Sequence, residues 1–465
     1  MDMDRYDVVI IGAGTAGIFA AYELCVLDPS RRILLIEKGK SLLGRNCPII
    51  EGRVTDCIGC RPCSIMSGFG GAGAYSDGKF NFTTQFGGWL NEYLDEKYIL
   101  ELIEYVDSIN VGFGATLERY STDGEKAMLL EKKALENDLH LLKAQVKHLG
   151  TEQNLNILKK LYQFLQGKLT ILFDTHVEQI SKSDDLFTLD LGGGRFVLCK
   201  DLIVAPGRSG AEWFSSICKN LGIGLINNQV DIGVRVELPA RVFDHITDVV
   251  YEAKLLYRTK QYGDIVRTFC MNPYGYVVSE NVDGIVTVNG HSYADKALRS
   301  ENTNFALLVS NRFTYPFNQP YQYGKRIASL SNMLGGGIIV QRFGDLIRGR
   351  RSNEHRLASS FTKPTLHATP GDLSLVLTKR HLDNIIEMIY ALDKIAPGIA
   401  NMDTLLYGVE VKFYSSRVEL TNEFETPIPS MFAIGDGAGI TRGLSQAAAS
   451  GIHVARVIVG RNHVK

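Results

Sequence analysis

The sequence predicts an α/β protein that begins with a Rossmann-type domain and adds a second, mixed α/β domain and a helical insertion. An apolar run at residues 6–11 leads into a glycine-rich turn and an alanine-rich helical stretch, which indicates strand, turn and helix. A second apolar run at 32–36 ends in an acidic residue, Glu37. Late in the chain, a strand at 431–434 again runs into glycines and a helix. Together these features are typical of a dinucleotide-binding fold.

The first turn reads Gly-Ala-Gly-Thr-Ala-Gly over residues 12–17, which is the spacing G-x-G-x-x-G. Gly12 permits a tight turn, Gly14 lets the backbone approach a pyrophosphate, and Gly17 lets the helix pack against the strand. The first N–H groups of the helix then face the phosphates. The strand before the turn and the helix after it make this motif much more specific than the glycines alone.

Glu37 follows Gly17 by 20 residues. At that distance a carboxylate accepts hydrogen bonds from both hydroxyls of an adenosine ribose, and glutamate in place of arginine disfavours a 2′-phosphate. The motif does not separate NAD from FAD. Because no second strand-bound G-x-G-x-x-G occurs between residues 211 and 399, we expect no separate NAD(P) domain.

Length, composition and charge limit the class of protein. With 465 residues, 45% of them hydrophobic, the chain can bury a large core and is expected to form two or three domains. Its 50 basic and 51 acidic residues leave no field that would attract nucleic acid or an anionic membrane. The N-terminus lacks a cationic signal region, and the apolar stretch at 8–27 is broken by glycines and carries Glu23. We therefore expect a soluble cytoplasmic protein without nucleic-acid or membrane partners.

The remaining periodicity predicts how the domains divide. Helical spacing of apolar residues at 89–109, 126–149 and 151–164 predicts three helices, and a glycine turn at 192–194 predicts a hairpin between short strands. From about residue 211 the strands become longer and helices follow them. The predicted division is a first domain in three parts at 1–118, 168–210 and 400–465, a helical insertion at 119–167, and a substrate domain at 211–399.

Three groups of residues resemble a known class of flavoproteins. The opening turn with Glu37, the strand that ends at 205–207 as Ala-Pro-Gly, and the late Gly435-Asp436 before a helix resemble proteins with the glutathione-reductase-type FAD fold. More narrowly, the runs 70–79, 269–276 and 435–446 resemble the largely uncharacterised FAD-dependent dehydrogenases of bacteria and archaea. The resemblance spans nearly the whole chain except the helical insertion, and it implies that the cofactor is FAD.

The resemblance also implies which residues contact FAD. Asp436 would bind the ribityl or pyrophosphate region, and Val177 would hold adenine by its backbone. The helix from Gly443 would point its N-terminus at the flavin and stabilise negative charge on the reduced ring. The full set of implied contacts is Gly12, Gly14, Thr15, Ala16, Gly17, Glu37, Lys38, Gly71, Gly73, Ala74, Val177, Ala205, Gly207, Gly435, Asp436, Gly443 and Leu444.

Four of the eight cysteines lie close together, as Cys47-Pro48 and a C-x2-C-x2-C run of Cys57, Cys60 and Cys63. Four-iron clusters use three such close cysteines and a remote one that often precedes proline, although here the remote cysteine lies upstream. Three interpretations stay open. The four thiolates hold a [4Fe-4S] cluster that relays electrons to FAD; or Cys60 and Cys63 form a catalytic, flavin-facing thiol or disulfide pair; or the group is structural zinc or plain buried thiols.

Proton transfer near the flavin needs a titratable group, and Tyr274, Tyr276 and His291 are the candidates. Tyrosine and histidine in a strand-rich domain are, however, more often core or surface residues than catalytic ones. We predict catalytic roles for Tyr274 and His291 as the hypotheses to compare with the structure.

Four arginines, at positions 342, 348, 350 and 351, crowd a stretch that also holds Asp345. Such a density can clamp an anionic substrate or a nicotinamide phosphate through bidentate contacts. Solvated arginines after a helix are the alternative.

These observations predict an FAD-dependent oxidoreductase that transfers a hydride or two electrons between a small-molecule substrate and a donor, which is NAD(P)H or a protein. Two alternatives stay open, one within enzymes and one from another class of protein. One is a monooxygenase that uses oxygen, and the other is a binding or RNA-modification protein in which FAD is mainly structural. The sequence does not name the substrate.

Overall fold

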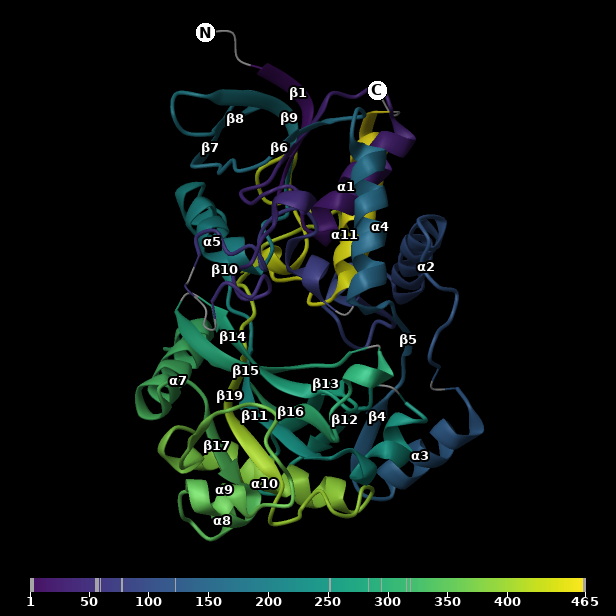
Figure 1. The fold of residues 1–465 in the computed structure, drawn as a ribbon. Helices are drawn as coiled ribbons and strands as arrows, with labels where there is room; N and C mark the ends of the chain where they lie inside the picture. Colours follow the sequence, from purple (N-terminus) through teal and green to yellow (C-terminus); the bar gives the residue numbers. More distant parts are fainter. Residues whose placement is uncertain are drawn as a thin grey trace. The chain divides into compact units, whose positions relative to one another are not determined.

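The computed structural model describes residues 4–54, 58, 60–76, 78–121, 123–250, 252–282, 284–293, 295–314, 316–317 and 319–462. The chain divides into two compact units (Figure 1). Unit 1 comprises residues 1–119, 147–228 and 414–465, and unit 2 comprises residues 120–146 and 229–413. Each unit has its own sheet and its own buried apolar core.

Unit 1 is built on a seven-stranded sheet in the order β6-β2-β1-β9-β8-β7, with β21 also paired to β9. The strands β6, β2, β1, β9 and β21 are parallel, and the hairpin β7–β8 is antiparallel. The strands of this sheet are β1 (Asp4–Ile11), β2 (Ile33–Ile36), β6 (Thr170–Leu172), β7 (Gln179–Ser183), β8 (Leu186–Asp190), β9 (Phe196–Val204) and β21 (Met431–Ala433). Fully buried apolar runs such as residues 33–36 suit parallel strands that are covered on both faces.

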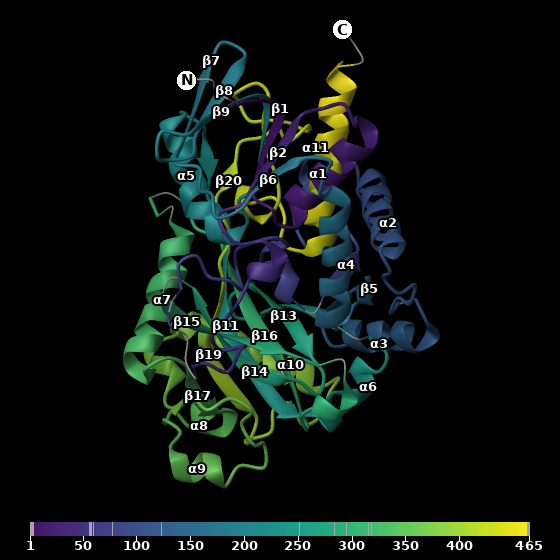
Figure 2. The same ribbon diagram turned by 45° about the horizontal axis from the view of Figure 1, so that its top comes forward.

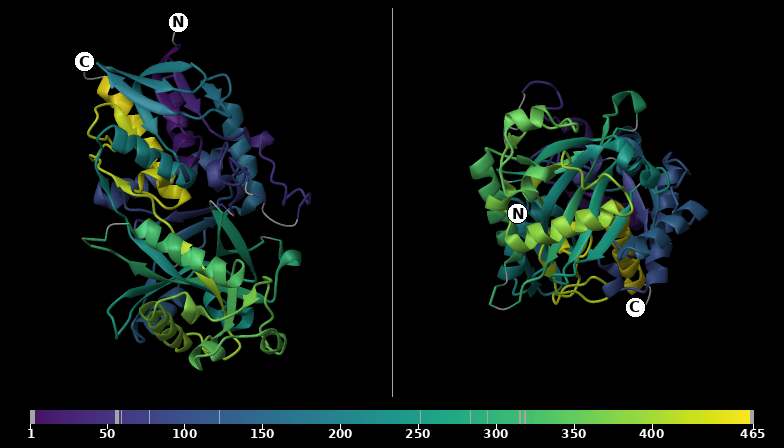
Figure 3. Two further views of the ribbon diagram at one scale, coloured as in Figure 1. Left: turned by 90° about the vertical axis from the view of Figure 1, so that its left-hand side faces the viewer. Right: turned by 90° about the horizontal axis from the view of Figure 1, so that it is seen from below.

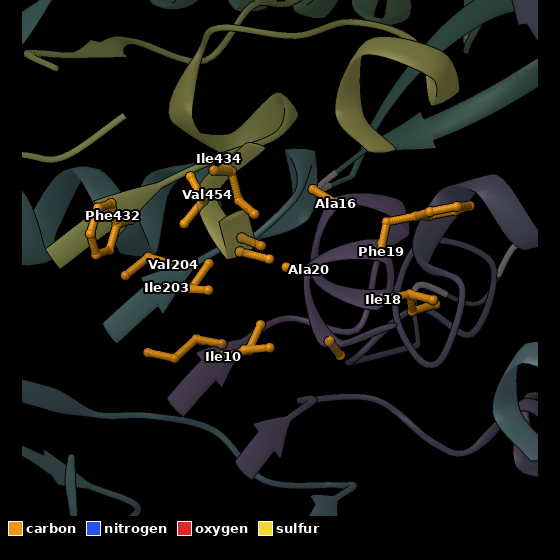
Figure 4. Close-up of a cluster of buried hydrophobic side chains, with 14 of the residues drawn as sticks. Ile10, Ala16, Ile18, Phe19, Ala20, Ile203, Val204, Phe432, Ile434 and Val454 are labelled. Atoms are coloured by element: carbon orange, nitrogen blue, oxygen red, sulfur yellow. The ribbon is translucent and has the colours of Figure 1, made fainter. Parts of the chain in front are cut away.

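Two helices from opposite ends of the chain pack together in unit 1 (Figure 2). They are α1 (Thr15–Leu27) and α11 (Leu444–Asn462). Gly451 allows this close approach, because a Cβ there would lie 2.2 Å from the carbonyl oxygen of Ala16. Figure 4 shows Ala16 and Ala20 of α1 near Ile203 and Val204 of β9 in this core. Small side chains at this contact thus allow the first and the last helix of the chain to pack closely.

The other elements of unit 1 surround this core. They are β3 (Lys79–Phe82), α2 (Glu96–Gly112), α4 (Gly150–Leu165), α5 (Ala211–Asn220), β10 (Leu225–Ile226) and β20 (Arg417–Val418). A further strand, β5 (Gln145–His148), lies where the chain returns from unit 2 to unit 1.

Unit 2 is built on an eight-stranded mixed sheet in the order β18-β17-β19-β11-β16-β13-β12-β4. Its strands are β4 (Leu139–Leu142), β11 (Val230–Pro239), β12 (Lys254–Arg258), β13 (Ile265–Asn272), β16 (Asn302–Asn311), β17 (Ile339–Arg342), β18 (Thr369–Pro370) and β19 (Leu405–Lys412). A separate hairpin is formed by β14 (Tyr276–Val282) and β15 (Ile285–His291). The helices are α3 (Glu125–Leu135), α6 (Asp244–Thr247), α7 (Pro320–Gly335), α8 (Phe343–Ile347), α9 (Glu354–Ala358) and α10 (Lys379–Asp393).

The two faces of this sheet differ. Figure 3 shows α10 lying across one face, where Val234 and Val236 of β11 belong to the apolar core. Successive side chains of a strand point to opposite faces. Asp231, Arg235 and Glu237 therefore lie on the other face, and all three are fully buried. Unit 2 thus has one apolar face and a second face, here called the polar face, that combines these buried charges with a smaller apolar cluster including Leu405 and Tyr407.

Three features of the predicted organisation differ from the structure. Residues 126–149 do not form one helix, because β4 follows α3 and pairs with β12, more than 100 residues away. The predicted insertion at 119–167 is not a unit of its own, since 120–146 belongs to unit 2 and α4 belongs to unit 1. The boundary placed at residue 400 also moves, because β19 pairs with β11 and β17 inside unit 2.

Within the described ranges, none of the helices combines the length and the hydropathy that crossing a membrane requires.

Candidate functional site

The first glycine turn has the local geometry that its spacing predicts. Gly12 has φ +102°, and a Cβ there would lie 2.1 Å from the carbonyl oxygen of Ala205. A Cβ on Gly17 would lie 1.9 Å from the carbonyl oxygen of Gly12. Around Gly14, by contrast, a Cβ would meet no described atom within 4 Å. Two of the glycines therefore serve close packing, and the third faces open space at the start of α1.

Glu37 ties this turn to two other loops. Its Oε2 accepts a hydrogen bond from the Ala13 N–H at 2.8 Å, and its Oε1 accepts from the N–H groups of Gly39 at 2.8 Å and Gly68 at 2.9 Å. A carboxylate has about four acceptor positions, so only one remains. Three backbone N–H groups thus hold the Glu37 carboxylate in place beside the first turn, and its contact with the ribose hydroxyls stays a prediction.

A second glycine-rich turn, at residues 68–73, lies against the first. The Gly70 N–H donates to the carbonyl oxygen of Ala13 at 2.8 Å, and a Cβ on Gly71 would lie 3.0 Å from Cα of Gly14. A Cβ on Gly73 would lie 2.8 Å from Cδ2 of Leu444 and 3.1 Å from Oγ1 of Thr15. Gly71, Gly73, Leu444 and Thr15, predicted separately, are thus brought together, and Ala74 is fully buried just behind them.

The C-terminal glycine segment closes on the same region. A Cβ on Gly435 would lie 3.0 Å from Cβ of Ala16, and a Cβ on Gly437 would lie 2.5 Å from Cγ of Pro206. Gly207, just after β9, has φ +61°, and a Cβ there would meet no described atom within 4 Å. Ala205, directly after the strand, is buried. Segments from residues 12, 205 and 435 therefore converge at the start of α1.

Asp436 lies at this convergence, half-buried. Its Oδ1 accepts a hydrogen bond from Oγ1 of Thr441 at 2.7 Å. Removal of the carboxylate from water raises the pKa of Asp436, while the charges of Arg208 and Arg442 and the Thr441 hydroxyl act to lower it. Among the described residues, Oδ2 has no hydrogen-bond donor. This oxygen is able to accept from a ligand hydroxyl, as the predicted ribityl contact requires.

The start of α11 is held by a segment that the sequence did not indicate, at residues 81–88. The Asn81 N–H donates to Oγ of Ser445 at 2.9 Å, and Nε2 of Gln446 donates to the carbonyl oxygen of Phe86 at 3.2 Å. Gly443 also approaches this segment, because a Cβ on it would lie 3.6 Å from Cα of Gly87. The adjacent glycines 87 and 88 were the signal that could have identified it.

Two buried acceptors at the same place lack partners in the described structure. They are Oδ1 of Asn81 and Oε1 of Gln446. A buried polar atom without a hydrogen bond is costly, and it marks a place where a ligand donor would be favourable. The open space at Gly14 and Gly207, together with these acceptors, fits an extended dinucleotide whose other end carries N–H groups.

Two predicted FAD contacts, Val177 and Lys38, already have protein partners. The carbonyl oxygen of Val177 accepts a hydrogen bond from Nε1 of Trp213 at 2.8 Å, so one of its two acceptor positions is used. Nζ of Lys38 donates to the carbonyl oxygen of Ser209 at 2.9 Å. Burial, followed by the charge of Lys38, lowers the pKa of the neighbouring His176, which therefore favours the neutral imidazole. The adenine contact of Val177 and the FAD contact of Lys38 stay predictions.

The cysteine cluster is only partly described. Cys47, Cys60 and Cys63 are free thiols, and Cys57 lies outside the described residues. In the portion of the chain that is described, no three histidine, cysteine, aspartate or glutamate side chains are grouped closely enough to hold a metal ion. The four-ligand cluster and the disulfide both stay predictions.

Tyr274 and His291, predicted to act in proton transfer, lie in unit 2. The Tyr274 hydroxyl donates to Oδ2 of Asp244 at 2.8 Å, and this hydrogen bond is the main reason that its pKa is raised. Arg299 lies over its ring at 5.5 Å. His291 ends β15, and its ring meets that of Tyr293 edge-on at 4.8 Å. Tyr274 is thus engaged in a structural pair, and catalysis by either residue stays a prediction.

The arginines at 342–351 surround a buried acid. Asp345 accepts hydrogen bonds from Nε of Arg350 at 2.8 Å, from Nε of Arg356 at 3.1 Å and from Oγ of Ser352 at 2.8 Å. Burial opposes ionisation of this carboxylate, but the three donors outweigh it and lower the pKa of Asp345. Arg342 pairs with Asp403. Arg342 and Arg350 are therefore held in ion pairs, and a clamp for an anionic substrate stays a prediction.

The polar face of unit 2 centres on Arg235, which the sequence did not single out. Its Nε and Nη2 donate to the two carboxylate oxygens of Glu410 at 2.8 and 3.0 Å, and its Nη1 donates to Oδ1 of Asn304 at 2.8 Å. Nζ of Lys412 also lies 2.8 Å from Glu410. A Cβ on Gly290 would lie 2.2 Å from Nη1 of Arg235, so the β14–β15 hairpin meets this network by its backbone.

Comparison with known proteins finds a family model that is similar to most of unit 2. Residues 229–413 match the model described as "FAD-dependent protein, C-terminal domain-like". This range is almost the whole of unit 2. Unit 2 is thus similar to a domain that is described in FAD-dependent proteins.

The relatives of the whole chain are distant. A protein of Clostridium beijerinckii described as uncharacterised is 26% identical over 471 residues, which covers 97% of this chain and 80% of that protein. Glycine oxidase from Geobacillus kaustophilus is 12% identical with a TM-score of 0.41, covering 99% of this chain and 95% of that one. L-proline dehydrogenase from P. horikoshii is 11% identical with a TM-score of 0.40, covering 98% and 94%. TM-scores this low do not establish a common fold.

Proposed function

We propose that the protein is an FAD-dependent oxidoreductase. The observation that carries the proposal is the convergence in unit 1 of three glycine segments on the start of α1, with open space at Gly14 and Gly207. The match of residues 229–413 to a domain of FAD-dependent proteins supports it independently. One feature comes from each unit, so the proposal does not depend on a single motif.

In this proposal, different residues of unit 1 bind different parts of FAD. The first turn of α1 and the backbone at Gly14 bind the diphosphate, because N–H groups at a helix start favour anions. Oδ2 of Asp436 accepts from the ribityl chain. The buried acceptors of Asn81 and Gln446 receive N–H donors of the ring. FAD, when bound, supplies transfer of a hydride or of two electrons.

The electron donor and the substrate are proposed by class. NAD(P)H or a protein delivers electrons, and a small molecule is the other reactant. A separate NAD(P) domain is not needed for this, since a nicotinamide can bind directly to a flavin site.

The test is the visible spectrum of anaerobically purified full-length protein, with flavin, iron and labile sulfide quantified per chain. We expect about one FAD per chain, and bleaching of the flavin bands when the physiological class of donor, tested as NADH and NADPH, is added. Folded protein that is colourless and does not take up added FAD would refute the proposal. A stable hydroperoxide after the reduced protein is mixed with oxygen would move the assignment to a monooxygenase.

The same sample decides among the cysteine interpretations. Stoichiometric iron and sulfide would establish the cluster. Flavin bands without iron would leave two interpretations, the thiol or disulfide pair and structural zinc or plain buried thiols. A thiol count before and after reduction by dithiothreitol detects a disulfide, and a zinc assay detects the metal. Because Cys57 lies outside the described residues, chemical analysis is the direct route.

A further inference from the structure

We propose that Arg45 is the buried counter-charge for the diphosphate of the dinucleotide. The inference rests on the proposed function, because it concerns the same site. No sequence motif pointed to this residue. Its contacts are all within unit 1, and they connect it to the two glycine turns that meet at Gly14.

Arg45 is 4% exposed and bonds only to backbone carbonyl oxygens. Its Nε donates to Ser64 at 2.9 Å, its Nη1 to Phe69 at 2.6 Å, and its Nη2 to Ile65 and Gly71 at 2.8 Å each. No carboxylate of the described chain lies within ion-pair distance of the guanidinium. Four of its five N–H groups are thus satisfied, while its charge has no direct partner.

A buried charge without an opposite charge is unfavourable. Burial accordingly lowers the pKa of Arg45. The charges of Tyr75, Glu37 and Cys63 act to raise this pKa, but burial outweighs them. The other deeply buried arginine, Arg235, behaves differently, because it pairs directly with Glu410. The position of Arg45 is therefore favourable when an anion is close to it.

The contacts place Arg45 behind the second glycine turn. A Cβ on Gly68 would lie 2.7 Å from Cδ of Arg45, and Gly71, whose carbonyl oxygen Arg45 binds, abuts Cα of Gly14. The ring of Tyr75 covers the guanidinium at 4.8 Å. A buried positive charge that binds the Gly71 carbonyl oxygen, next to the predicted diphosphate turn, attracts an anion there more strongly than a surface charge would.

The geometry also gives Arg45 a positioning role. By binding the carbonyl oxygens of Phe69 and Gly71, it fixes the turn whose Gly70 N–H holds Ala13. Loss of the side chain is therefore expected to weaken every ligand of the site to some extent. The counter-charge role is distinguished by its dependence on the phosphates, because adenosine carries no charge and ADP carries the diphosphate.

The experiment compares ADP with adenosine as probes, titrated by calorimetry into full-length protein from which flavin has been removed. The variants are R45M and R45Q, which are neutral, and R45K, which keeps the charge. R456M is the control, because Arg456 is a part-buried arginine of unit 1 that pairs with Glu23 at 2.7 Å. Far-UV circular dichroism and the melting temperature are recorded for each.

We expect the ratio of ADP affinity to adenosine affinity to fall about tenfold in R45M and R45Q, and to stay within about twofold of wild type in R45K and R456M. R45Q serves if R45M does not fold. An unchanged ratio in a folded neutral variant would overturn the inference, even if both affinities drop together. If the wild type binds neither FAD nor ADP, it is the proposed function that fails.

Discussion

The polar groups of the two units differ in kind: backbone groups in unit 1 and charged side chains in unit 2. In unit 1 the site is mostly backbone, since glycines at 12, 71 and 435 permit close packing, while Gly14 and Gly207 face open space. In unit 2 the polar face consists of charged side chains on strands, led by the buried pair Arg235 and Glu410. Glycines in the sequence indicate a backbone site, whereas no local pattern indicates a buried ion pair. The sequence is therefore informative about binding in unit 1. The stability of unit 2, by contrast, depends on paired charges that only the fold reveals.

The largest expected effect lies in unit 2. R235M leaves Glu410 buried and, among the described residues, paired only with Lys412, so we expect a loss of about 3–5 kcal/mol in the free energy of unfolding. The control is R380M, since the side chain of Arg380 is 59% exposed and its pair with Asp264 is expected to contribute less than about 1 kcal/mol. Urea unfolding of both variants measures the difference. Equal losses would contradict the view that unit 2 depends on its buried pair.

A second effect in unit 2 depends on pH. His381 is 4% exposed, its Nδ1 lies 2.6 Å from Oγ1 of Thr378, and its Nε2 lies 3.0 Å from Oδ1 of Asn311. Burial lowers its pKa from 6.5 to about 4. As the pH falls, the folded state thus takes up the proton later than the unfolded state. The contribution of neutral His381 to the free energy of unfolding is therefore complete above pH 6.5, and it is lost as the pH falls toward 4.

The difference between the unfolded and folded pKa values of His381 corresponds to a loss of about 3 kcal/mol in the free energy of unfolding. We expect wild-type stability to fall more steeply than that of H381Q when urea unfolding is compared at neutral and at mildly acidic pH. The other titratable groups are the same in both proteins, so the difference between the two pH profiles reports on His381 together with Asp264, whose pKa its charge helps to lower. Parallel pH profiles would show that the imidazole is hydrated in the folded state.

The sequence predicted the backbone site better than it predicted unit 2. Glycine spacing after an apolar run identified the turn at 12–17, since few other folds need that spacing. Helical periodicity failed at residues 139–142, because their strand depends on pairing with β12 far along the chain. Arg235 was missed because apolar and polar residues that alternate along a strand look like a solvated face. Arg45 was missed for a similar reason, since nothing local shows that an arginine binds four carbonyl oxygens.

The smallest expected change in stability, with the clearest functional consequence, is in unit 1. G14A adds a methyl group where no described atom lies within 4 Å, so we expect a stability change below about 1 kcal/mol. The same methyl group occupies the space in front of α1, and we expect FAD affinity to fall about tenfold or more because the diphosphate cannot approach the backbone. Flavin fluorescence titration and thermal unfolding measure the two quantities.

Two neighbouring variants sharpen the result. G17A would bring a Cβ to 1.9 Å from the Gly12 carbonyl oxygen, so it should lower stability and FAD affinity together. G460A, in the last turns of α11 with equally open surroundings, should change neither by much. If G14A binds FAD as tightly as G460A does, the open space at Gly14 is not where the cofactor lies. The distinction between packing glycines and binding glycines would then have to be abandoned for unit 1.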